Sequence, residues 1–377
     1  MRILATSAPN QGHFYPMLST LWALRAVGHD VIVGVPESFA EVAASTGLPA
    51  VAVSEGFRLG SLGSSAAGQG PSIEDLTEHL LDYYVPAASI TAEGIVGLAE
   101  TWRPSLVVST GWEYSGPIAA ARLGVPFLLH GWGLLADPVL DAPVAEALRP
   151  LHTAWGLPDG VPAPWRIIDN CPPTLQWTDV PANAIHSRYA PYNGTGVLPG
   201  WLFAAPTKPR VLVTLGHVPI KANHDDVLSR TVAALREFDI ELVLAVGDQL
   251  DTSGLDLPAG TRVARGLPLN QLVQDCALVI HHGGAGSAMA ATDAGVPQLG
   301  LPQMCVQYQH ADRIAQVGAG LTLHPAQAAV AAIAEAVDEL LAADGPRQVV
   351  KTLRHENSQA PSLPDVVARV EAGYRER

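Results

Sequence analysis

Strand-like and helix-like segments alternate along this chain, and the alternation starts twice. Three short, apolar or β-branched runs near the N-terminus are typical of buried strands: residues 2–8, 30–35 and 48–53. Residues 16–27, which place leucines at helical spacing before Gly28, and residues 37–46, which precede Gly47, predict the helices between them. Pro16 suits the first position of the first helix. The order β-α-β-α-β predicts a parallel sheet with helices on both faces.

The pattern begins again after residues 188–210, a Pro/Gly-rich stretch that we take as the linker. The strand candidates of the second half are residues 210–216, 241–247, 261–266, 277–282 and 296–302. We therefore expect an α/β protein with two Rossmann-like, doubly wound domains that face each other across a cleft. The expected domains are residues 1–195 and 208–360, with a helix at 361–377 that packs back on the first domain. Ligands of such sheets bind beyond the carboxyl ends of the strands.

Two segments interrupt this alternation. Residues 54–72 are rich in Gly and Ser and predict a surface loop. Residues 131–170 hold many Trp and Pro residues without a clean period, so we expect short helices and loops near a binding surface.

The composition excludes several classes of protein. Of the 377 residues, 48% are hydrophobic and 15% are charged, which allows large cores and excludes a disordered chain. The net charge of −14 argues against a general nucleic-acid footprint. The three cysteines form neither a disulfide framework nor a zinc pattern. Because no signal peptide and no membrane span are evident, we expect a cytoplasmic protein that binds neither nucleic acid nor membrane.

The most informative junction is ALVIHHGGAGSAMAATDAGVP, residues 277–297. A buried strand ends at two histidines, glycines make the turn, and a small-residue helix follows. A helix N-terminus has unpaired N–H groups and about half a positive charge. Glycines let the backbone approach a ligand without a Cβ in the way. The junction therefore predicts an anion site suited to phosphates.

Other interpretations of this junction are weaker, although a Gly-rich turn without a ligand stays open. Adjacent side chains at a strand end point to opposite faces, so His281 and His282 cannot easily share a metal, and no acidic or Cys cluster lies beside them. GxGxxG is absent after the first strand and GK[ST] is absent throughout, which argues against dehydrogenase and kinase chemistry.

A second candidate is His13 in NQGHFYP, which follows the first strand. A His at the carboxyl edge of a sheet can act as a general base near neutral pH. The alternative is a turn or capping histidine. A phosphate cradle in one domain and a base in the other would let a nucleotide donor and an acceptor meet in the cleft.

The chain resembles a known family in these stretches. Residues 263–320, from VARGLPLNQ to AQVGAG, are similar to the donor-binding signature of inverting nucleotide-sugar glycosyltransferases with the GT-B fold. Residues 10–36 and the RVLVTLG segment at 210–216 also match the family pattern. Within that family the chain looks most like actinobacterial enzymes that attach deoxysugars to polyketides and other antibiotics.

The resemblance implies roles for individual residues and implies neither a metal nor a resident cofactor. His13 would deprotonate the acceptor. The residues implied at the diphosphate are His282, Gly283, Gly284, Ala285, Gly286 and Ser287. Those implied at the nucleotide are Gly216, His217 and Leu267, and those at the sugar are Val306 and Gln307.

Three departures from the family pattern narrow the expected chemistry. Thr110 stands about where an Asp orients the catalytic His, and Glu113 could substitute for that Asp. Val306 replaces an Asp at the sugar, which favours a sugar that lacks a hydroxyl. Ala290 replaces a Glu that contacts the ribose in some relatives, which favours a dTDP donor over UDP.

Residues 124–138 and 169–175 further resemble the subgroup that acts on angucycline-like aromatic polyketides, including C-glycosyltransferases. That subgroup suggests Asp137 as a second candidate base, although an Asp before Pro138 is also a common turn former. Trp112, Trp132 and Trp155 are expected to shape an apolar acceptor pocket, with ordinary core packing as the alternative for each.

The predicted activity is transfer of a deoxysugar from a dTDP-sugar to a polyketide or other aromatic aglycone, with inversion, through oxygen or carbon. The alternatives are a sugar-nucleotide 2-epimerase, which uses the same fold, and a non-catalytic homologue that assists another glycosyltransferase. The expected partners are the aglycone and the dTDP-sugar, and a homodimer stays open.

Overall fold

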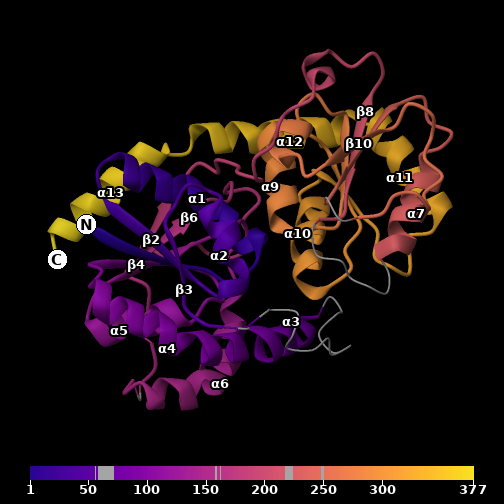
Figure 1. Cartoon of the computed structure of the whole chain (residues 1–377). Helices are drawn as coiled ribbons and strands as arrows, with labels where there is room; N and C mark the ends of the chain where they lie inside the picture. Colours follow the sequence, from indigo (N-terminus) through magenta and orange to yellow (C-terminus); the bar gives the residue numbers. More distant parts are fainter. Residues whose placement is uncertain (56, 58–71, 158, 162, 217–223, 248–249) are drawn as a thin grey trace. The chain divides into compact units, whose positions relative to one another are not determined.

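The computed structural model describes the chain except for residues 56, 58–71, 158, 162, 217–223 and 248–249 (Figure 1). The chain divides into two compact units. Unit 1 comprises residues 1–171, 176–190 and 360–377, and unit 2 comprises residues 172–175 and 191–359. The boundaries expected from the sequence at residues 195, 208 and 360 stay predictions.

The described residues of unit 1 form a parallel sheet of seven strands. They are β1 (Arg2–Thr6), β2 (Asp30–Val35), β3 (Ala50–Ala52), β4 (Leu106–Thr110), β5 (Phe127–His130), β6 (Arg166–Asp169) and β7 (Ala184–His186), in the order β3-β2-β1-β4-β5-β6-β7. Strands β1 and β4 are parallel neighbours. From β1 the chain builds the sheet outward in one direction to β3, and from β4 it builds outward in the other, so the strand order reverses between β1 and β4. This reversal is where doubly wound sheets bind ligands.

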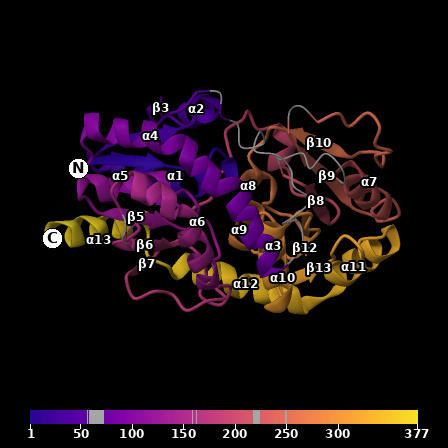
Figure 2. The ribbon, with the colours of Figure 1, turned by 90° about the horizontal axis from the view of Figure 1, so that it is seen from below.

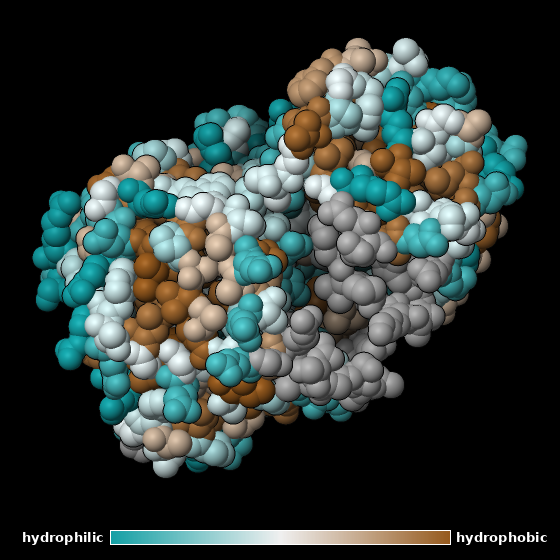
Figure 3. Space-filling view, viewed as in Figure 1, coloured by the Kyte–Doolittle hydropathy of each residue, from teal (hydrophilic) through white to brown (hydrophobic). Residues whose placement is uncertain are grey.

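The helices of unit 1 lie on both faces of this sheet (Figures 1 and 2). They are α1 (Gln11–Ala26), α2 (Glu37–Ala44), α3 (Ile73–His79), the π-helix η2 (Leu80–Tyr84), α4 (Val85–Trp102), α5 (Ser115–Leu123), the 3-10 helix η3 (Pro138–Leu140), α6 (Asp141–Ala154) and α13 (Leu363–Arg375). Helix α4 packs against α5, and α13 packs against α1. The visible face of unit 1 shows apolar residues among hydrophilic ones (Figure 3).

The described residues of unit 2 form a parallel sheet of six strands. They are β8 (Arg210–Thr214), β9 (Glu241–Val246), β10 (Arg262–Arg265), β11 (Leu278–His281), β12 (Gln298–Gly300) and β13 (Gly320–Thr322), in the order β10-β9-β8-β11-β12-β13. The helical segments are η4 (Gly200–Phe203), α7 (His224–Ala234), α8 (Leu269–Leu272), α9 (Ala285–Ala294), α10 (Cys305–Gln316), α11 (Val330–Ala342) and α12 (Asp344–Gln359).

The core of unit 2 follows from strand alternation. Along β8, Val211 and Val213 belong to one apolar cluster, whereas Leu212 belongs to a second cluster. Successive side chains of a strand point to opposite faces, so each cluster covers one face of the sheet. The doubly wound α/β fold predicted from the sequence is confirmed for both units.

The sequence misplaced some elements. Helix α1 begins at Gln11 rather than at Pro16, because the Asn10 side chain accepts a hydrogen bond from the Gly12 N–H and caps it. His13 therefore lies in the first helical turn. Residues 131–170, expected to hold only short helices and loops, contain the 14-residue helix α6 and the strand β6.

The predicted loop at residues 54–72 lies almost entirely outside the described residues. Within the described part of the chain, no helix has the length and apolar character needed to cross a membrane.

Candidate active site

Aromatic side chains surround His13 at the carboxyl edge of the sheet in unit 1. His13 follows β1, Trp112 follows β4 and Trp132 follows β5. The His13 ring centroid lies 4.2 Å from that of Trp132 and 5.9 Å from that of Trp112. Because parallel strands end at the same edge, the fold brings together three residues that are far apart in sequence. Trp155 packs instead in the apolar core around α4.

The remaining side of the His13 ring is covered by Tyr84, the last residue of the π-helix η2. The Tyr84 hydroxyl lies 3.0 Å from His13 Nε2 in a buried hydrogen bond. Tyr84 is 4% exposed, and its ring centroid lies 5.3 Å from that of His13. Sequence reasoning missed Tyr84, because a π-turn has no periodic signal, and the Tyr83–Tyr84 pair was the only hint.

The environment of His13 keeps its imidazole neutral. Burial lowers the pKa of His13 to about 4, and nearby His79 acts in the same direction. The Gly111 backbone opposes this and raises the pKa, although His13 Nδ1 makes no regular hydrogen bond within the described residues. A neutral imidazole has a lone pair, so it can accept a proton.

Neither Thr110 nor Glu113 holds the His13 ring in this structure. Thr110 is buried, and its hydroxyl has no hydrogen-bond partner among the described residues. The Glu113 carboxylate accepts hydrogen bonds from the N–H groups of Ser115 and Gly116, at 2.8 and 2.9 Å, and from the Thr6 hydroxyl. It therefore stabilises the N-terminus of α5. Burial raises the pKa of Glu113, and these hydrogen bonds partly offset the shift.

Asp137 also has a local role in the structure. Its carboxylate accepts a hydrogen bond from the Val139 N–H at 3.0 Å and caps η3. In the described part of unit 1, no hydrogen bond joins Asp137 to His13.

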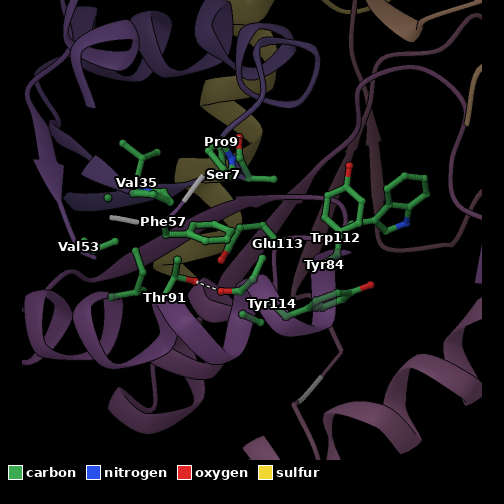
Figure 4. A pocket seen from close by; sticks show the side chains of 16 residues that line it. Ser7, Pro9, Val35, Val53, Phe57, Tyr84, Thr91, Trp112, Glu113 and Tyr114 are labelled. Carbon is green, nitrogen blue, oxygen red and sulfur yellow. Dashed lines mark hydrogen bonds between the residues drawn. The ribbon is translucent and has the colours of Figure 1, made fainter. Parts of the chain in front are cut away.

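A small pocket, partly open to solvent, lies at the carboxyl edge of β1, β2 and β4. Figure 4 shows Tyr84 and Trp112 side by side at one end of it and Val35 and Val53 at the other. Glu113 also lines the pocket, whereas His13 is not among its lining residues. Most of the lining is apolar or aromatic, so the pocket suits an apolar group.

In unit 2, the junction of β11 and α9 is built from glycines. Gly283 has a φ of +80°, and a Cβ at this position would collide with the backbone carbonyl oxygen of Gln307. A Cβ on Gly284 would collide with His282 Nε2. No side chain caps α9, whose first turn holds Ala285, Gly286 and Ser287. The turn therefore presents a helix N-terminus whose N–H groups can bind an anion.

The residues implied at the nucleotide are partly described. A Cβ on Gly216, which has a φ of +82°, would lie 2.7 Å from His282 Cε1, so the Gly216 loop packs directly on the His282 ring. Leu267 packs against an apolar cluster beneath the sheet. His217 lies outside the described residues.

His281, to which the sequence assigned no role, supports the glycine turn. Its Nδ1 accepts a hydrogen bond from the Gly283 N–H at 2.9 Å, and its Nε2 lies 2.8 Å from Gln298 Oε1. The ring proton must therefore sit on Nε2. Gln298 in turn donates to the Thr292 hydroxyl at 3.0 Å. Burial lowers the pKa of His281 to about 4, so the ring stays neutral and the network stays intact.

The first turn of α10 lies against this junction. Val306 is half-buried, and Gln307 is buried with its side-chain oxygen accepting the Gln303 N–H at 2.7 Å. The amide NH2 of Gln307 points away from that bond and can serve as a donor.

Asn193 is a second residue that the sequence did not single out. Its Oδ1 accepts a hydrogen bond from the Asn270 backbone N–H at 3.1 Å. An oxygen must occupy that position, so the NH2 group faces the other way. Nδ2 lies 3.8 Å from the place that a Cβ of Gly286 would occupy, at the N-terminus of α9.

Among the described residues, no group of three His, Cys, Asp or Glu side chains could hold a metal ion. Glycine N–H groups, a histidine and side-chain amides are the polar groups that gather at the α9 N-terminus. These donors suit a phosphate group.

Comparison with known families decides what kind of protein this is. Residues 22–216 match the N-terminal domain of the erythromycin biosynthesis protein CIII-like family, and residues 229–372 match the C-terminal domain of that family. This chain belongs to the erythromycin biosynthesis protein CIII-like family.

Individual relatives are similar over nearly the whole chain. L-demethylnoviosyl transferase of Streptomyces niveus is 36% identical, over 98% of this chain and 97% of the relative. Aclacinomycin-T 2-deoxy-L-fucose transferase of Streptomyces galilaeus is 30% identical, over 86% of this chain and 84% of the relative. The solved structure of spinosyn rhamnosyltransferase SpnG has a TM-score of 0.87 and 31% identity, and covers 98% of this chain and 100% of its own.

These similarities identify the protein as a glycosyltransferase of natural-product biosynthesis with the GT-B fold of two Rossmann-like domains. SpnG has also been solved with thymidine diphosphate and with the spinosyn aglycone. The family and fold predicted from the sequence are thus confirmed.

Proposed function

We propose that this glycosyltransferase moves a deoxysugar from a dTDP-sugar to an aromatic or polyketide acceptor, with inversion at the anomeric carbon. The uncapped N-terminus of α9 behind the glycine turn is the observation that carries the proposal. The names of the relatives support the sugar class, because they include a 2-deoxy-L-fucose transferase. The complexes of SpnG with thymidine diphosphate support the nucleotide.

In this proposal unit 2 holds the donor. The Gly286 N–H group, the His282 ring and the Asn193 amide donate to the diphosphate. Their positive ends stabilise the charge that develops on the leaving group as the sugar departs. In this proposal these groups supply the stabilisation, and we expect transfer without a metal ion.

The residues around the sugar and ribose set the specificity. Val306 meets the carbon that lacks a hydroxyl, and the Gln307 amide donates to a remaining hydroxyl. A hydroxyl buried against Val306 would lose its hydrogen-bond partner, which costs about 1–3 kcal/mol. Ala290 is buried within α9 and offers no carboxylate to a ribose 2′-hydroxyl, which favours a dTDP donor over a UDP donor.

Unit 1 binds the acceptor and supplies the base. The acceptor oxygen, or an activated ring carbon, attacks the anomeric carbon from the face opposite the diphosphate. The bond from that carbon to the diphosphate oxygen breaks as the new bond forms. His13, neutral in its aromatic surroundings, receives the acceptor proton. Asp137 is the second candidate for this role, although its carboxylate caps η3 here.

Calorimetry with dTDP and a turnover assay with dTDP-sugars test the proposal. Binding of dTDP and its release during sugar transfer are the expected results. A 2-epimerase would change the sugar without transferring it to the acceptor. An auxiliary homologue would bind dTDP without turnover. NMR of the product reports the anomeric configuration and the linkage. Absence of dTDP binding would overturn the proposal at its root.

A further inference from the structure

The Tyr84 hydroxyl covers the Nε2 atom of His13. Within the described residues, His13 Nδ1 has no regular hydrogen-bond partner, and Nε2 is hydrogen-bonded to the Tyr84 hydroxyl at 3.0 Å. The two residues are 71 positions apart, so this contact depends on the fold. Any proton that reaches Nε2 along this direction must cross the Tyr84 oxygen.

Tyr84 faces both His13 and the pocket. It lines the pocket together with Trp112, while His13 does not (Figure 4). Its ring is fixed by Trp112, with centroids 5.3 Å apart, and by His79, with centroids 5.7 Å apart. Because Tyr84 lines the pocket and His13 does not, an acceptor in the pocket meets Tyr84 before it meets the imidazole.

The titratable groups around Tyr84 leave His13 neutral and able to accept a proton. Burial lowers the pKa values of both His13 and His79 to about 4, so both rings are neutral near pH 7. Asp82, on the same π-turn, is exposed, and the Glu113 carboxylate is held by the start of α5. No described carboxylate is hydrogen-bonded to His13, so the hydroxyl is its polar partner.

We propose that Tyr84 is a catalytic residue that relays the acceptor proton to His13. As the acceptor oxygen bonds to the anomeric carbon, its proton moves to Tyr84 Oη. The proton that Tyr84 already carried moves to His13 Nε2, and the dTDP leaves with the electron pair of the broken sugar–phosphate bond. Tyr84 thus ends the step as a phenol and His13 ends it protonated. This inference rests on the proposed function, since it takes His13 as the base.

The substitution Tyr84→Phe removes only the hydroxyl and keeps the ring contacts. Tyr83→Phe is the matched control, because Tyr83 is on the same π-turn and its ring packs on His79 rather than on His13. The assay uses 4-methylumbelliferone as the phenolic probe and the dTDP-6-deoxysugar that the wild-type protein turns over fastest. We expect kcat to fall about 100-fold in Y84F with KM for the probe within about twofold, and no such fall in Y83F.

A proton inventory separates a relay from a positioning effect. In mixtures of H2O and D2O, a plot of the wild-type kcat against the fraction of D2O should be curved, because two protons move in one step. The same plot for Y84F should be a straight line. A wild-type kcat in Y84F, or the same straight line in both proteins, overturns the relay. His13→Asn keeps the two failures distinct: if H13N retains full activity, the assignment of His13 fails too. Calorimetry with dTDP shows that each variant has folded and binds its donor nucleotide normally.

Discussion

Two junctions between a strand and a helix, one in each unit, follow strands that flank the point where the strand order of the sheet reverses, and the two junctions have opposite chemistry. In unit 1, β1 leads to α1, whose N-terminus is capped by the Asn10 side chain. In unit 2, β11 leads to α9, which no side chain caps. Each junction holds a buried, neutral histidine, His13 or His281.

The difference lies in what fills the space beyond each strand. Around His13 the space is filled with aromatic rings, and the Gly12 N–H at the start of α1 is already taken by the Asn10 side chain. Beyond His281 the glycines leave the backbone without side chains, and the histidine holds the turn by accepting the Gly283 N–H. One sheet edge is thereby suited to an apolar acceptor and a proton acceptor, and the other to a phosphate.

The largest effect tests the shared feature of the two junctions, their neutral histidines. The pKa values of five buried histidines are lowered to about 4: His13, His79 and His130 in unit 1, and His281 and His310 in unit 2. The unfolded chain takes up these protons near pH 6.5, while the folded chain does not until about pH 4. Unfolding therefore binds protons in this window, and the free energy of unfolding falls as the pH falls.

From pH 7 to pH 5 we expect the free energy of unfolding to fall steadily, by up to about 1 kcal/mol per histidine per pH unit. Denaturant unfolding at pH 7, 6 and 5 measures the loss, and hydrogen exchange compares the units. Unit 1, with three of the five histidines, should lose more than unit 2. The raised pKa of Glu113 acts in the opposite direction. A stability that is flat across this range would contradict the neutral histidines.

The second largest effect is expected from a substitution that disrupts only the anion site of unit 2. Gly283→Ala puts a Cβ against the Gln307 carbonyl, at a φ of +80°. Gly260→Ala is its control, because Gly260 has a φ of +84° and nothing within 4 Å of a Cβ. Both changes cost about 1–2 kcal/mol for the left-handed backbone. Only G283A should weaken dTDP binding, by about 100-fold as judged by calorimetry. Equal affinities in the two variants would remove the turn from the donor site.

A smaller effect tests the side-chain amide at the same helix end. Asn193→Asp keeps the oxygen that accepts the Asn270 N–H but replaces the NH2 near Gly286 with a negative oxygen. Repulsion should weaken dTDP binding by about 30-fold, or about 2 kcal/mol. Thymidine, which lacks phosphate, serves as the control ligand and should bind N193D and wild type alike. A parallel loss for thymidine would place Asn193 away from the diphosphate.

The smallest effect compares one buried threonine in each unit. Thr110 and Thr292 are both 1% exposed, but among the described residues only the Thr292 hydroxyl has hydrogen-bond partners. Thr292→Val leaves the Gln298 amide without its acceptor and should cost about 1–3 kcal/mol. Thr110→Val should stay within about 0.5 kcal/mol of wild type, because its hydroxyl makes no hydrogen bond. Urea unfolding measures both, and equal losses would show that Thr110 has a partner in solution.

The sequence predicted what depends on local periodicity. The alternation of strands and helices, the glycine turn after His281 and the position of His13 near a strand end are all visible within short windows. Family resemblance added the donor class and the GT-B fold. These features are encoded by neighbours in the chain, so they can be inferred without knowledge of packing.

The sequence did not predict contacts that depend on distant packing. Nothing near His13 indicates that Tyr84 would reach it, and nothing near Gly286 indicates Asn193. Glu113 was expected as a substitute orienting group, but the nearest unpaired N–H groups, at the start of α5, take its carboxylate. The Glu113 carboxylate binds these local N–H groups and not the more distant His13 ring, and sequence spacing alone could not reveal that choice.

The π-helical turn at Leu80–Tyr84 has a consequence for how this site can change over time. Residues 73–102 run through α3, η2 and α4 without a break, and the π-turn accommodates one residue more than an α-helical turn. Deletion of a single residue there would restore a regular α-helical turn, so the residues on either side would keep their faces while the residues of the turn itself would shift. Tyr84, the last residue of the turn, would then lose its place against His13 although no aromatic residue had been substituted. A change in chain length of one residue could thus switch the proton chemistry of the site, and an alignment that records only substitutions would miss it.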